Sequence, residues 1–218
     1  MKPDTNQIIA ALVAQSAPVR RLAPAWRRAL GYLGFAALVL LTLALLRGVR
    51  ADLAPRLATA AFATALAGGL ATGIAGTLAA LMLAAPDRSR WWIALPAATA
   101  SVWLGAVGLG CLTLWVPITP GAVTAAEVSR CLATVILAGT PLSLALVWLL
   151  HRATPLRPGL PLAAAALGAS GMTAAALSLL HSIDPSAMIL AWNAGIVALA
   201  ALAHWLAHTL ASRTLRPA

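Results

Sequence analysis

Six long apolar stretches, separated by short polar segments, constrain the fold of this chain more than any other feature. They cover residues 29–46, 58–85, 91–115, 131–150, 160–180 and 186–210. A helix needs roughly 20 apolar residues to cross the hydrocarbon core of a bilayer. Only 9% of the residues are charged, whereas a soluble domain carries about 25%. The sequence therefore predicts an all-α, polytopic integral membrane bundle of six transmembrane helices, with the lipid bilayer as a partner.

The positions of the basic residues predict which side of the membrane each loop faces. Eleven of the 15 Lys and Arg residues lie in the N-terminal arm, the second and fourth loops and the tail, and four lie in the other three loops. Because Lys and Arg gather in cytoplasmic loops, we expect both termini in the cytoplasm. The same distribution accounts for the net charge of +10 without direct binding to nucleic acid.

Three regions follow from this arrangement. A cytoplasmic arm that binds a partner is expected over residues 1–28, and a cytoplasmic tail over residues 211–218. The transmembrane domain between them, residues 29–210, is expected to begin with a span that is not cleaved, because no small-residue cleavage site follows it.

The acidic residues narrow the functional classes, because all of them lie in the arm or the loops. They are Asp4, Asp52, Asp87, Glu127 and Asp184. A proton-coupled transporter usually keeps an ionisable group in the middle of the membrane. No paired carboxylates, Ser-His-Asp set or Gly-rich phosphate loop offers catalysis either. We therefore expect a protein that is not an enzyme and needs no cofactor. A small transporter or channel with cysteines at its outer face is the alternative, and a lipid-embedded scaffold subunit is a third possibility.

A stripe of small residues runs along the second apolar stretch. It consists of Ala65, Gly69, Gly73 and Thr77, at intervals of four residues. Such a stripe lets two helix backbones approach closely. We expect it to pack against another helix of the same chain rather than to form a dimer.

The N-terminal arm has the pattern of a short amphipathic helix. Asp4 is a candidate cap, with Gln7 three residues later as in a capping box, and Pro18 ends the helical pattern. The apolar residues on one helical face are Ile8, Ile9, Leu12 and Val13. A helix this short is marginal alone in water. Because it carries no basic residue of its own, we favour a cytoplasmic protein partner over the bilayer surface, which basic amphipathic helices prefer.

The two cysteines are candidates for redox sensing. A hairpin could bring Cys111, near the outer end of the third span, close to Cys131, at the outer start of the fourth. Both would face the oxidising side, and Cys131 at a helix N-terminus would have thiolate character. Packing as small apolar residues is the alternative. Together with His181, the cysteines form a weaker candidate for a metal site, so no metal is expected.

Short motifs occur in order over nearly the whole chain. They are residues 1–4 (MKPD), 8–12 (IIAAL), 17–22 (APVRRL), 86–90 (PDRSR, before a tryptophan), 131–141, 150–152 (LHR), 155–158 (PLRP), 180–181 (LH) and Trp192. In these motifs and in their order over six spans, the chain resembles the NrsF family, the negative regulators of sigma F.

The resemblance implies a six-span anti-sigma factor in the inner membrane of a Gram-negative bacterium. Its partner would be an extracytoplasmic-function sigma factor, released on stress at the outer side. The arm would bind that factor through apolar anchors and two arginines. The residues expected to bind it are Asp4, Ile8, Ile9, Leu12, Val13, Arg20 and Arg21.

One departure from the family pattern bears on sensing. The family pairs the cysteine at the position of Cys131 with another that directly follows the histidine of the last outer turn. This chain has Ser182 there. A redox or metal-sensing role therefore requires Cys111 to supply the second thiol. The alternatives are that this chain senses another signal or is a paralogue that has lost the switch.

Overall fold

The computed structural model shows a chain built of helices, and its described residues contain no strand. The described residues are 5–15, 22–113, 125–153, 158–180, 192–199 and 202–203. The elements are α1 (Thr5–Gln15), α2 (Ala25–Arg47), α3 (Leu53–Leu57), α4 (Ala60–Leu83), the 3-10 helix η1 (Arg90–Ile93), α5 (Ala94–Thr113), α6 (Ala125–Ala153) and α7 (Gly159–Leu180). Residues 192–199 are also helical. The all-α fold class predicted from the sequence is confirmed.

Four of these helices are long and apolar enough to cross a membrane. They are α2, α4, α6 from Ser129 onward, and α7. These four coincide with the first, second, fourth and fifth expected spans. The third expected span coincides with η1 and α5, and more than half of the sixth lies outside the described residues. A total of six spans, with both termini in the cytoplasm, stays a prediction.

The local sequence explains where the first long helix begins and ends. Pro24 precedes α2, and its carbonyl accepts hydrogen bonds from the N–H groups of Arg27 and Arg28 at 3.0 and 3.3 Å. The helix ends before Gly48, whose φ of 76° lies in a region that residues with a Cβ rarely adopt. The Gly48 N–H still donates to the Ala44 carbonyl at 2.9 Å. A proline and a glycine therefore bound this helix.

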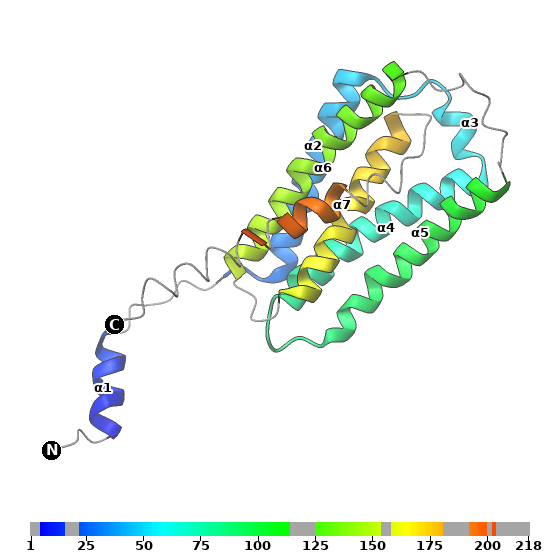
Figure 1. Cartoon of the computed structure of the whole chain (residues 1–218). Coiled ribbons are helices and arrows are strands. Elements are labelled where there is room, and N and C mark those ends of the chain that lie inside the picture. Colours follow the sequence, from blue (N-terminus) through cyan, green and yellow to red (C-terminus); the bar gives the residue numbers. More distant parts are fainter. Residues whose placement is uncertain are drawn as a thin grey trace.

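The long helices form one bundle, and α1 lies apart from it (Figure 1). α7 packs on α4 and on α6, α2 packs against α4 and α6, and α5 covers another side of α4. Successive helices run in opposite directions, so the connections gather at two ends (Figure 1). One end holds the start of α2, the end of α4, η1, the end of α6 and the start of α7. The other holds α3, the start of α4 and the end of α7.

Glycines bring α4 and α7 into backbone contact. This glycine seam consists of Gly69, Gly73 and Gly76 of α4 and Gly168 and Gly171 of α7. A Cβ added at Gly76 would lie 2.5 Å from the Gly168 nitrogen and 2.7 Å from the Ala164 carbonyl oxygen. One added at Gly168 would lie 2.9 Å from the Thr77 nitrogen. Gly69, Gly73 and Thr77 of the predicted stripe pack against α7 inside the monomer, and Gly76 extends the contact.

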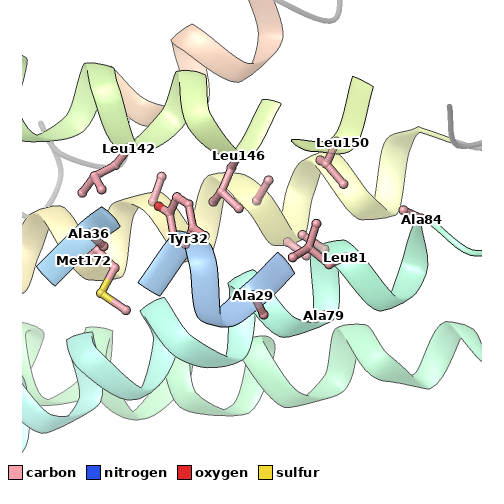
Figure 2. Close-up of a cluster of buried hydrophobic side chains, with 14 residues drawn as sticks. Ala29, Tyr32, Ala36, Ala79, Leu81, Ala84, Leu142, Leu146, Leu150 and Met172 are labelled. Atoms are coloured by element: carbon pink, nitrogen blue, oxygen red, sulfur yellow. The ribbon is translucent and has the colours of Figure 1, made fainter. Parts of the chain in front are cut away.

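A large apolar cluster joins four helices beside this seam. It includes Tyr32 of α2, Leu81 of α4, Leu142 and Leu146 of α6, and Met172 of α7, each at most 5% exposed. Figure 2 shows Tyr32 among the side chains of α4, α6 and α7. The four candidate spans are therefore held together by one continuous core rather than by separate pairs.

We expect Gly76→Ala to destabilise the protein by about 1–3 kcal/mol, because two packed backbones must separate to admit the methyl group. Thermal unfolding of the full chain in detergent measures this effect. Gly105→Ala in α5 is the matched control, since nothing lies within 4 Å of its added Cβ. Its stability should stay equal or rise by up to about 1 kcal/mol. Equal stabilities of the two variants would contradict close backbone packing at the glycine seam.

Candidate functional site

The helix α1 carries largely exposed apolar side chains. Ile9 is 53% exposed and Val13 is 66% exposed. Because they are four residues apart, they lie on the same face of the helix. The side chains of Ile8 and Leu12, predicted for the same face, lie outside the described residues. The amphipathic helix expected in the arm is thus present over Thr5–Gln15, and two of its predicted anchors are accessible to a partner.

The rest of the arm is described only near the bundle. Asp4, Arg20 and Arg21 lie outside the described residues. Leu22 is 55% exposed, and Trp26 is half exposed with the Arg27 guanidinium 5.1 Å from its ring. Trp26 belongs to α2, which begins at Ala25, four residues before the expected first span. An aromatic ring and a cation at this position suit a membrane interface.

The bundle end next to the arm is strongly basic. The arginine-rich end carries Arg27, Arg28, Arg88, Arg90 and Arg152. Arg88 lies 4.0 Å from Asp87 in an exposed, weak ion pair, and the Arg152 guanidinium lies 3.8 Å above the ring of Trp148. Two side-chain nitrogens of Arg28 are buried without a hydrogen-bond partner in the described part of the chain. This end therefore holds positive charge that the described carboxylates do not neutralise.

At the opposite end, one carboxylate, that of Asp52, binds two arginines. Arg50 donates from Nε to Asp52 at 2.6 Å, and Arg56 donates from Nε to the second carboxylate oxygen at 2.8 Å. The Arg50 side chain is 6% exposed and lies 5.6 Å from the Phe62 ring. The Arg50 N–H donates to the Leu179 carbonyl at 3.1 Å, which satisfies an end group of α7. The loop between α2 and α4 is thus fixed to the end of α7.

Hydrogen bonds from these arginines lower the pKa of Asp52 well below its usual range. A lowered pKa means that the carboxylate's contribution to stability is present above the ordinary pKa near 4 and is lost only as the pH falls through the lowered value. Mild acid therefore leaves this ion cluster intact.

One of the two cysteines predicted to sense redox changes, Cys131, is buried. Cys131 is 3% exposed and packs with Trp103, Val135 and Leu177. Cys111 belongs to α5, and its side chain lies outside the described residues. The burial of Cys131 fits a packing role, because reactive cysteines are partly exposed. Trp103 of α5 is 2% exposed in the same cluster.

One expectation about Cys131 is wrong. The residue does not stand at a helix N-terminus, because α6 begins at Ala125, six residues earlier. Ala and Glu are good helix formers, and the Ala125-Ala126-Glu127 segment extends the helix ahead of the apolar stretch. Cys131 therefore lacks the helix-end activation predicted for it. As for the weaker metal site, the described residues contain no cluster of three ligands, and His181 lies outside them.

Sequence reasoning missed a polar contact inside the bundle. Ser143 of α6 donates to the side-chain oxygen of Asn193 at 2.7 Å, and both residues are buried. The Trp192 indole N–H donates to Thr140 at 3.3 Å. Gly139 leaves room for this approach, since a Cβ there would lie 3.0 Å from the Asn193 oxygen. An amide within an apolar stretch was the available signal, because such groups join membrane helices by hydrogen bonds.

We expect Asn193→Ala and Ser143→Ala each to destabilise the protein by about 0.6–1.7 kcal/mol, the range for hydrogen bonds between membrane helices. The double variant should lose less than the sum, because both changes remove the same bond. Ser101→Ala is the control, since Ser101 is exposed and bonds only its own helix at Ala97. Additive losses in detergent unfolding would show that the pair is not coupled.

The fold and these surfaces define a helical, membrane-type protein with an exposed N-terminal helix and a bundle that is basic at one end. The family model for NrsF, negative regulator of sigma F, matches residues 12–216. This chain therefore belongs to the NrsF family, as its motifs suggested. The family description indicates a regulator of a sigma factor rather than an enzyme, with a sigma factor as partner. No curated protein matches the chain, and no solved structure does.

Proposed function

We propose that this protein is a membrane-bound anti-sigma factor that holds an extracytoplasmic-function sigma factor at the bacterial inner membrane through its N-terminal arm. The exposed apolar face of α1 is the observation that carries the proposal. Ile9 and Val13 remain largely exposed on a helix that lies apart from the bundle. An 11-residue helix is marginal alone in water, so a groove on a partner would stabilise it.

The rest of the arm completes the proposed interface. Asp4 would cap the helix, and Ile8 and Leu12 would extend the apolar face by their spacing. Arg20 and Arg21 would meet acidic groups on the sigma factor and speed the encounter. Membership of a regulator family favours this reading over a transporter or channel.

Sequestration requires the arm to share a compartment with the sigma factor. The excess of arginine at the bundle end where α2 begins supports a cytoplasmic N-terminus. A stress signal at the opposite end would then shift the helices between two arrangements, one of which presents α1 in its binding geometry. Each 1.4 kcal/mol of difference between the two states changes the amount of free sigma factor about tenfold.

We expect Ile9→Glu and Val13→Glu each to weaken sigma-factor binding at least about 30-fold, as hot-spot anchors worth about 2 kcal/mol do. Glutamate is a good helix former, so α1 should persist. Gln7→Glu adds the same charge on the opposite face of α1, where the side chain is exposed, and should bind normally. The measurement is retention of each extracytoplasmic-function sigma factor of the source organism on membranes carrying the full chain, with a reporter of sigma-dependent transcription. Normal retention by both apolar-face variants would refute the docking role of α1.

The proposal also includes a thiol signal, for which Cys131 and Cys111 would be the sensing residues. If they sense oxidation together, Cys131→Ala should abolish oxidant-induced release of the sigma factor. Val135→Ala is the matched control, because Val135 lies one helical turn away in the same buried cluster. A Cys131→Ala protein that still responds to oxidant would exclude the thiol signal and leave arm docking untouched.

A further inference from the structure

A cavity opens at the arginine-rich end of the bundle, between α4, η1 and α7. Its volume is about 690 Å³, within the range of small-molecule sites. The lining residues are Leu83, Ala84, Ala85, Pro86, Arg88, Arg90, Gly159 and Leu160. The end of α4 and Leu160 thus give the cavity an apolar wall, and two guanidinium groups give it a basic rim.

The rim has the chemistry that recognises a phosphate. A guanidinium group presents several donors in a planar fork and binds phosphate through two parallel hydrogen bonds. The ion pair of Arg88 with Asp87 is 4.0 Å long and exposed, so it leaves the Arg88 donors available. The first N–H groups of a helix lack partners within it. Gly159 and Leu160 line the cavity and are the first two residues of α7, so the positive end of the helix dipole lies beside it.

The neighbouring residues place the cavity at headgroup depth. Trp91 is 82% exposed and follows Arg90 directly, and such indole rings prefer the interface between headgroups and acyl chains. The cavity lies at the end of α4 and the start of α7, both of which are candidate spans. A ligand here would therefore meet basic groups on its polar side and apolar groups on its other side.

We propose that this cavity binds the headgroup of an anionic phospholipid. Arg88 and Arg90 contact its phosphate, and the glycerol and upper acyl chain lie along Leu83 and Leu160. Basic pockets between membrane helices select anionic lipids in this way. An acidic peptide segment would match the basic rim but not the apolar wall. The site is separate from the face of α1 and does not depend on sigma-factor binding.

Native mass spectrometry of the purified full chain tests this site. The probes are phosphatidylglycerol, phosphatidylcholine with the same acyl chains, and inorganic phosphate. The wild type should retain phosphatidylglycerol at least tenfold more than phosphatidylcholine. The double variant Arg88→Gln, Arg90→Gln should retain about tenfold less phosphatidylglycerol than the wild type. The double variant Arg47→Gln, Arg130→Gln removes the same charge at the opposite end, where both residues are exposed, and should retain the lipid normally.

A second variant tests the space inside the cavity independently of its charge. Leu160→Trp keeps both arginines but fills the space, and it should also lower phosphatidylglycerol retention about tenfold. Equal lipid retention by the Arg88/Arg90 variant and the wild type would overturn the proposal. So would inorganic phosphate bound as tightly as the lipid. If the Arg88/Arg90 variant lost sigma-factor binding but kept its lipid retention, the cavity would belong to a protein partner. That result would also overturn the lipid proposal.

Discussion

Backbone contact between α4 and α7 along the glycine seam is the constraint on which the rest of the structure depends. Apolar side chains alone do not drive helices together in lipid, because the acyl chains are as apolar as leucine. Close approach replaces that driving force with dispersion contacts between backbones. With α4 and α7 fixed, α5 packs on one side of the pair, while α2 and α6 close the apolar cluster on the other.

In this helix bundle, the two ends have different electrostatic characters. At one end Asp52 binds Arg50 and Arg56, and Arg50 also ties the loop to α7. At the other end arginines from α2, η1 and α6 stand with little compensating charge. The second end carries the arm and the cavity beside Arg88 and Arg90.

Much of this architecture follows from local sequence, and the rest depends on contacts distant in the chain. Of the six spans predicted from apolar length, four coincide with helices long and apolar enough to cross a membrane. Spacing predicted α1, and the small-residue stripe predicted the seam. The start of α6 at Ala125 was missed because the helix formers Ala125, Ala126 and Glu127 precede the apolar stretch. The bond between Ser143 and Asn193 joins positions 50 residues apart, and the cavity needs two helix ends side by side. Neither could be predicted from periodicity.

Orientation of the arm is the claim on which sequestration depends, and thiol accessibility in intact cells measures it directly. In a chain with Cys111 and Cys131 replaced by alanine, single cysteines are placed at Gln7 of α1 and at Ala54 of α3, both exposed. With a reagent that cannot cross the inner membrane, the account predicts labelling at position 54 in intact cells and at position 7 only after lysis. Labelling at position 7 in intact cells would contradict it.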